Sequence, residues 1–307
     1  MLKKTRCDGT PIRDLPPFTV LMPFVMPTRA ASVIFFDQEV DVTGTQKRIK
    51  EINRELIKQR EIVTLFDVVL AAAARGVALR PKVNRFISGK RFYQRNQIVF
   101  NFVAKKELSD EGEEVNVKIP FEPSDTVFTV ARRVHAYVKK AISDEGLDND
   151  QVVKTLGRMP HFVKCFVAWS LEFLDRHNLM PSDMIESDPC YCSVFLANVG
   201  SFDLEAPFHH LYDRGNCPIF IAMGKVKAEN RLESDGGITE RKILRLRYSF
   251  DDRVADGVYM AKALNFIKGF VENMQALETP PDIDPKIIAE LNLRQASLDP
   301  GLGAQES

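Results

Sequence analysis

Hydrophobic and polar residues alternate along several short segments of the chain, which is the pattern of half-buried β-strands. The clearest case is 243–250, where Leu244, Leu246, Tyr248 and Phe250 alternate with polar side chains. The Asp235-Gly236-Gly237 sequence just before it indicates a β-hairpin turn. We expect strands over 33–42, 91–93, 98–104, 115–119, 191–197, 219–226 and 243–250.

Helical spacing of apolar residues separates these strands. The segment 65–79 is the strongest example, with Thr64 placed to cap the helix and Asp67 in its first turn. Similar spacing predicts helices around 49–56, 124–138, 152–174 and 260–271. Mixed strands and helices in this order predict an α/β sandwich with helices packed on one face of a sheet.

The two ends of the chain differ from the middle. Residues 11–27 hold five prolines among large apolar side chains, so we expect residues 1–27 to form an extended N-terminal arm packed on its own or a neighbouring subunit. Residues 280–307 contain Pro280, Pro281 and Pro285 and end in polar residues, which predicts a loose C-terminal tail. One catalytic-type domain would then span 28–279.

Composition limits the function classes. The 307 residues are 45% hydrophobic and 27% charged, and 42 basic residues balance 42 acidic ones, so no net charge favours nucleic acid or anionic lipid. The most apolar run, 63–79, is too short to span a bilayer and includes Asp67 and Arg75, so no membrane association is expected. The N-terminus lacks an apolar signal segment and the cysteine count, five, is odd, which predicts a cytoplasmic protein with free thiols.

The segment from Phe250 to Gly257 reads F-D-D-R-V-A-D-G. It resembles the F-D-H-R-x-x-D-G signature of the dihydrolipoyl acyltransferase catalytic domain of 2-oxoacid dehydrogenase complexes. Asp252 stands where that family has its histidine base, whereas Asp251, Arg253 and Asp256 match. Further landmarks of the family occur in order at 38–42, 64–84, 197–200 and 218–225, so the resemblance covers roughly 28–277.

The resemblance implies a chloramphenicol acetyltransferase-like fold with a mixed sheet, a homotrimer with sites between subunits, and coenzyme A or acyl-coenzyme A as cosubstrate. No permanently bound cofactor is implied. We expect no lipoyl domain in cis, so a lipoyl-bearing or carrier protein would act in trans. The chain is most similar to short stand-alone members of the superfamily.

Family catalysis requires a base that takes the proton of a thiol and a hydroxyl that stabilises an oxyanion. Both are altered here, because Asp252 replaces the histidine and Ala197 stands at the expected hydroxyl position. A carboxylate of pKa about 4 opposite a thiol of about 8.5 makes proton transfer unfavourable by roughly 6 kcal/mol. Ser193, earlier in the same strand, supplies the hydroxyl only if the register slips.

The loop 208–215 contains His209, His210 and Asp213 and offers a compensation. An imidazole from this loop would act as base if the loop lines the thiol channel, leaving Asp252 to orient that imidazole or to pair with Arg253. The alternative is that both histidines belong to a subunit contact.

Other candidates carry weaker signals. Asp256 would orient Arg253 or hold the turn, and the resemblance implies substrate binding by Ser193, Asn198 and Arg253. Cys190 and Cys192 lack the C-x-x-C loop of metal sites, so no metal is expected. A set of basic residues lies among aromatic residues and favours a solvated hairpin face over a clamp for a phosphate of coenzyme A or a nucleic-acid contact. The set is Arg85, Lys90, Arg91 and Arg95.

Two functions remain open from the sequence. The first is an acyltransferase that moves an acyl group between coenzyme A and an unidentified thiol, hydroxyl or amine. The second is a catalytically silent trimeric scaffold or acyl-coenzyme A binding protein, which the loss of the family histidine favours.

Overall fold

The computed structural model describes residues 6–105, 114–143 and 157–294. Its centre is a six-stranded mixed sheet in the order β2-β9-β8-β7-β5-β6. Strand β7 pairs in parallel with both β5 and β8, and the remaining pairs are antiparallel. The strands are β2 (Val33–Asp41), β5 (Ile98–Lys105), β6 (Glu114–Phe121), β7 (Val194–Asn198), β8 (Ile219–Leu232) and β9 (Ile238–Asp251).

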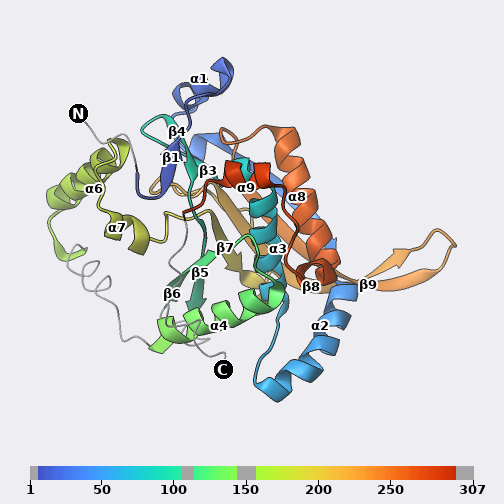
Figure 1. The fold of residues 1–307 in the computed structure, drawn as a ribbon. Helices are drawn as coiled ribbons and strands as arrows, with labels where there is room; N and C mark the ends of the chain where they lie inside the picture. The colour runs from blue at the N-terminus through green and yellow to red at the C-terminus, as the bar shows by residue number, and fades with distance from the viewer. Residues whose placement is uncertain (1–5, 106–113, 144–156, 295–307) are drawn as a thin grey trace.

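Helices of the described chain cover one face of this sheet (Figure 1). Helix α3 is the innermost, because every residue from Asp67 to Ala78 is buried. The helices on this face include α2 (Thr43–Leu56), α3 (Leu65–Leu79), α4 (Val127–Ser143) and α8 (Gly257–Glu272). The α/β sandwich with a mixed sheet and helices on one face is therefore confirmed.

The capping and hairpin signals also hold. Thr64 and Asp67 form a reciprocal capping box at the start of α3, with the Asp67 backbone N–H donating to the Thr64 hydroxyl. Gly236 has a φ of +83° in the turn between β8 and β9, a conformation that favours glycine. Both elements were identified from their local sequence.

The N-terminal arm is not extended throughout, so that expectation is wrong. It contains β1 (Gly9–Pro11) and a helix, α1 (Pro17–Val25). Pro17 lies at the first helical position, where a missing N–H costs nothing, and Pro23 lies inside the helix. Proline therefore starts this helix instead of preventing it.

The tail also departs from expectation over its described part. Residues 285–291 form α9 (Pro285–Leu291), capped by the Asp284 carboxylate, and Leu291 is fully buried. The prediction of a loose tail is wrong for this segment, which packs against α3. Residues 295–307 lie outside the described part of the chain.

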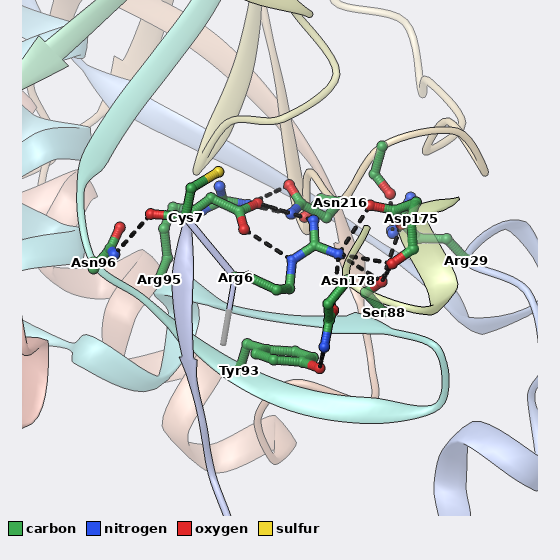
Figure 2. A network of polar contacts seen from close by, with 12 residues as sticks. Arg6, Cys7, Arg29, Ser88, Tyr93, Arg95, Asn96, Asp175, Asn178 and Asn216 are labelled. Carbon is green, nitrogen blue, oxygen red and sulfur yellow. Dashed lines mark hydrogen bonds and ion pairs between the residues drawn. The ribbon is translucent and has the colours of Figure 1, made fainter. Parts of the chain in front are cut away.

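A second, small sheet lies beside the large one and has the order β1-β4-β3, with β3 (Arg85–Ser88) and β4 (Arg91–Arg95) forming a hairpin. The expected solvated face holds for Lys90 and Arg91, which are exposed, but it is wrong for Arg95, which is 2% exposed. Arg95 lies next to a buried polar network centred on Arg6 (Figure 2). Arg6 pairs there with Asp8 and Asp175.

The predicted helix over 152–174 corresponds to α6 (His161–Arg176), and 152–156 lie outside the described residues. Helix α6 buries none of its side chains, and α7 (Ser182–Ser187) follows it. Among the described helices none is both long and apolar enough to cross a membrane.

We predict that Thr64→Ala lowers the free energy of unfolding by about 1–2 kcal/mol, because the first turn of α3 loses its cap. Chemical denaturation monitored by circular dichroism measures the change. Thr64→Ser keeps the hydroxyl and is the matched control, for which less than half of that loss is expected. An equal loss in both variants would contradict the capping argument.

Candidate active site

The family-like turn at the end of β9 is built around a buried ion network. Arg253 donates two parallel hydrogen bonds to Asp251, with Nε–Oδ1 and Nη2–Oδ2 distances of 2.7 Å each. The Nε of Arg29 lies 3.8 Å from the second carboxylate oxygen. Each of these three residues is at most 6% exposed. One carboxylate therefore balances two guanidinium groups at the strand end.

This network holds a loop that we call the histidine loop, residues 206–215. Arg29 donates hydrogen bonds to the carbonyl oxygens of Tyr212, Asp213 and Gly215. The Asp213 carboxylate in turn accepts a hydrogen bond from the backbone N–H of Ala30. The loop is thus tied to the segment before β2 and, through Arg29, to the end of β9.

Close backbone contacts fix both ends of the histidine loop. A Cβ on Gly224 would come within 2.5 Å of the Ala206 nitrogen, so β8 and the start of the loop touch directly. Gly215 has a φ of +75°, and a Cβ there would lie 2.4 Å from the Cys190 carbonyl oxygen. Glycine is needed at both places for steric reasons.

His209 is the ordered imidazole of this loop. Its ring stacks on Phe220 with centroids 3.9 Å apart and planes inclined by 6°, and its carbonyl oxygen accepts a hydrogen bond from the Ser249 hydroxyl. Its Nδ1 lies 2.7 Å from the His210 carbonyl oxygen. Because a carbonyl only accepts, Nδ1 carries the proton in the neutral ring and Nε2 carries the lone pair.

The surroundings keep this ring neutral. Burial lowers the pKa of His209 below its usual value, more than the His210 carbonyl raises it, and the charge of His210 lowers it further. His210 stacks on His209 with centroids 4.4 Å apart and is itself exposed. A neutral imidazole whose Nε2 has no hydrogen-bond partner among the described residues is the form required of a general base.

His209 lies on the sheet face opposite the helices. On that face Phe195, Ala197, Phe220 and Ala222 form or adjoin one apolar cluster, whereas Leu196 and Ile221 point to the helix-covered core. Phe195 pairs with Phe220 and Ala197 with Ala222 in the β7–β8 register. The structure therefore places His209 on the same face as the position where the family hydroxyl is expected.

The residues of the family-like turn have separate placements. The Asp252 backbone N–H donates to the Ser32 carbonyl, and its carboxylate forms no hydrogen bond or ion pair with any described residue. Asp256 is exposed and caps α8 by accepting a hydrogen bond from the Tyr259 N–H at 2.9 Å. It does not contact Arg253, whose carboxylate partner is Asp251. A pairing of Asp252 with Arg253 or with either histidine is likewise not formed within the described chain.

Two of the expected substrate-binding residues, Ser193 and Asn198, differ in burial and in hydrogen bonding. Ser193 is fully buried, and its hydroxyl accepts from the Val99 N–H and donates to the Gln97 carbonyl. Its hydrogen bonds therefore join β5 to β7. The Asn198 side chain is half-buried and its amide forms no hydrogen bond with described residues. Substrate binding by either residue stays a prediction.

Sequence reasoning missed Arg29 and Ser249, which position the histidine loop. Neither lies in a motif, and their contacts reach residues about 40 to 186 positions away in the chain. Cys192 and Cys217 are buried, and the described residues include no group of three side chains arranged to hold a metal ion.

Comparison with known proteins agrees with this fold. Residues 179–279 match the family model of 2-oxoacid dehydrogenases acyltransferase (catalytic domain). Among solved structures, a protein described as a "probable dihydrolipoamide acetyltransferase" from Listeria monocytogenes is similar, at 14% identity and a TM-score of 0.56 over 87% of this chain and 96% of that one. A chloramphenicol acetyltransferase is similar at 12% identity and a TM-score of 0.53, over 86% and 99%.

The cubic core of a pyruvate dehydrogenase multienzyme complex is also similar, at 13% identity and a TM-score of 0.51 over 87% of this chain and 93% of that one. No curated protein matches the chain. The fold is therefore that of the chloramphenicol acetyltransferase-like acyltransferases, and the resemblance to the 2-oxoacid dehydrogenase acyltransferase domain is confirmed. The family match includes the histidine loop and the turn from Asp251 to Gly257.

We predict that Asp251→Asn lowers the free energy of unfolding by about 3–5 kcal/mol, because it leaves two buried guanidinium groups without their carboxylate. Asp252→Asn is the matched control next to it, and since its carboxylate has no partner in the described chain a change within about 0.5 kcal/mol is expected. Urea denaturation of the two variants measures both values. Equal destabilisation would show that the network does not depend on Asp251.

Proposed function

We propose that this protein is a coenzyme A-dependent acyltransferase in which the imidazole of His209 replaces the missing family histidine as general base. The observation that carries the proposal is the His209 ring, whose pKa is lowered and whose Nε2 is the lone-pair nitrogen, on the sheet face opposite the helices. The family match and the fold supply the reaction class. The acyl group would pass between coenzyme A and an acceptor thiol, hydroxyl or amine.

The proposed step begins with proton transfer from the coenzyme A thiol to His209 Nε2. The thiolate then attacks the acyl carbonyl carbon, and the carbonyl electrons move onto oxygen as the tetrahedral intermediate forms. Collapse of that intermediate expels the thiol, hydroxyl or amine group that had carried the acyl group, and this leaving group takes the proton back from the imidazolium. Every proton and electron pair is accounted for without a metal ion.

The energetic argument favours the imidazole over Asp252. The pKa of an ordinary imidazole, near 6.5, is about two units below that of a thiol, whereas the pKa of a carboxylate is more than four units below it. This difference in pKa corresponds to roughly 3 kcal/mol of proton-transfer free energy. The lowered pKa of His209 reduces this advantage but keeps the ring deprotonated at neutral pH. Asp252 would then act through substrate or through a neighbouring subunit, and Asn198 would donate its free amide to the substrate.

An exposed apolar surface supports a site shared between subunits. Large apolar side chains on the histidine-loop side of the sheet are exposed, including Phe35, Phe202, Leu204 and Phe208 at 47%, 47%, 57% and 50%. The similar pyruvate dehydrogenase protein forms a cubic core. We propose a homotrimer whose subunits cover this surface, with a lipoyl-bearing or other carrier protein presenting the acceptor in trans in the cytoplasm.

A second function has its own support. Ala197 offers no hydroxyl and Asp252 no imidazole, and these two replacements together favour a trimeric scaffold that binds acyl-coenzyme A without turnover. Binding of coenzyme A is common to both functions. Turnover separates them.

We predict that His209→Gln lowers the rate of acyl exchange between acetyl-coenzyme A and a small thiol by at least about a hundredfold, the usual contribution of a general base. His210→Gln is the matched control. It is expected to change the rate less than about fivefold, since the His210 ring is exposed and forms no hydrogen bond with a described residue. The wild-type rate should rise with pH through a value below about 6.5, because the His209 pKa is lowered. Stopped-flow or mass-spectrometric exchange assays measure these rates.

The outcomes separate the two functions. Loss of exchange in Asp252→Asn alone, with His209→Gln fully active, would replace the imidazole by a carboxylate base. Calorimetric binding of coenzyme A without any exchange in the wild type would support the scaffold. Absence of both binding and exchange would remove both functions.

We predict a mass in solution of three times the 34.8 kDa of one chain, measured by light scattering. Phe208→Asp should shift the protein toward monomer, because it places a charge in the apolar surface that we propose to be covered. Leu232→Asp, at the exposed end of β8 where the side chain is 76% exposed, is the control and should stay trimeric. A wild-type monomer would contradict the shared site.

A further inference from the structure

A cavity of about 220 Å³ lies near the edge of the large sheet that is opposite to β2. The N-terminal segment, β4, β5, β6 and α7 meet there. Its polar lining comes from Arg95, Lys118, Asp8, Gln97 and Glu186. Val99, Pro120 and Ile185 form an apolar side. Its lining shares no residue with the histidine loop or with the turn after β9.

Arg95 is the deepest charge of this cavity. It is 2% exposed, and its guanidinium stacks on Phe86 at 4.7 Å from the ring centroid. Within the described residues its Nη2 donates hydrogen bonds to the backbone and side-chain oxygens of Asn216. Its Nε is buried and has no hydrogen-bond partner in the described chain. Burial lowers the pKa of Arg95, which shows how far this cation is removed from water.

Lys118 supplies a second cation from β6. Its ammonium donates to the carbonyl oxygens of Ile185 and Asp188 at 2.8 and 2.9 Å, so one of its three N–H groups remains. Neither Lys118 nor Arg95 forms an ion pair with any residue in the described part of the chain. Two such cations lining one cavity favour an anion there, because an unpaired buried charge is costly.

The acidic groups nearby interact with this pair electrostatically but accept no hydrogen bond from either cation's side chain through a carboxylate. Asp8 is held by Arg6 through Nε–Oδ1 and Nη2–Oδ2 contacts of 2.8 and 3.2 Å, and its second oxygen also accepts from Asn216 (Figure 2). The charge of Arg6 keeps the pKa of Asp8 below its usual value although burial opposes this. Glu186 lies at the exposed rim. The cavity therefore has two cations that form no direct ion pair with a described carboxylate, although Asp8 interacts with both electrostatically.

The volume of the cavity and its apolar side limit which ligands can fit. Pockets for drug-sized molecules measure about 300–1,000 Å³, so this one suits a molecule of few heavy atoms. A guanidinium edge and an ammonium match the oxygens of a carboxylate, and the apolar side suits a short hydrocarbon chain rather than water. We propose that this cavity binds a short-chain aliphatic carboxylate, with its carboxylate on Arg95 and Lys118 and its chain toward Val99 and Pro120.

Binding is expected to depend on pH. Burial lowers the pKa of Lys118 to about 8, and the charge of Arg95 lowers it as well. Since the protonated ammonium binds the anion, affinity should be full below that value and should fall as pH rises through it. The titratable and charged groups around Lys118 are Arg95, Cys192, Asp188 and Asp8, together with Cys7, Glu186, Tyr137 and Tyr191 of the cavity lining.

The experiment titrates the full-length protein with sodium butyrate, butyramide, sodium acetate and sodium phosphate by calorimetry at pH 7. We expect saturable butyrate binding, no binding of the uncharged butyramide, and weaker binding of acetate and phosphate. Lys118→Gln keeps a hydrogen-bond donor but removes the charge, and should weaken butyrate binding at least about tenfold. Lys58→Gln, at an exposed lysine outside the cavity, is the control and should bind as the wild type does.

Several results would overturn the proposal. They are no saturable butyrate binding up to about 50 mM, equal affinity for butyramide, unchanged affinity in Lys118→Gln, or tighter binding of phosphate than of butyrate. If Lys118→Gln does not fold, the comparison of butyrate with butyramide on the wild type decides the matter. No coenzyme A is present in these titrations, so their outcome is independent of acyl transfer.

Discussion

The candidate active site depends on one buried carboxylate, Asp251, between two guanidinium groups. Arg253 fixes it from within the same turn, and Arg29 approaches it from the segment before β2. Arg29 also binds three carbonyl oxygens of the histidine loop. In a low-dielectric interior such charges must be compensated, so the strand end, the N-terminal segment and the loop form a single unit.

This arrangement separates two roles that the family motif combines. Position 252 follows the buried Asp251 but has no part in the network, whereas His209 is positioned by contacts that the network supports. A substitution at position 252 therefore leaves the architecture of the turn intact. The loss of the family histidine does not imply the loss of the surrounding site, because packing and chemistry depend on different residues.

Much of the fold followed from local sequence. Alternation in 243–250, the Thr64 cap and the Gly236 turn each act over a few residues, and all appear where they were expected. The errors have local causes too. Pro17 and Pro285 were taken as signs of irregular chain, yet both begin helices, and Asp284 before Pro285 is a capping signal that the sequence contained. The burial of Arg95 was missed and a solvated face was predicted instead, because this burial depends on Asn216, which lies 121 positions away.

The candidate site was less predictable for the same reason. The motif from Asp251 to Gly257 and the histidine pair were visible, but Arg29 and Ser249 carry no local signal and act only once distant segments meet. Which carboxylate would be buried was also not encoded in the motif. Asp251 and Asp252 are identical side chains, and Asp251 is buried where it pairs with Val33 of β2 and with the guanidinium groups of Arg253 and Arg29.

The glycine contacts at the two ends of the histidine loop have a consequence for how the protein can change. Gly224 fixes the backbone at Ala206 and Gly215 fixes it against Cys190, so the distance that the loop must span is set by the scaffold. Between these anchors, the exposed side chains of Pro207, Phe208 and His210 can be exchanged without moving the sheet, whereas Leu211 is buried against it and Asp213 binds the Ala30 N–H. The exposed surface of segment 207–214 can therefore change while the backbone at both ends of the loop stays in place.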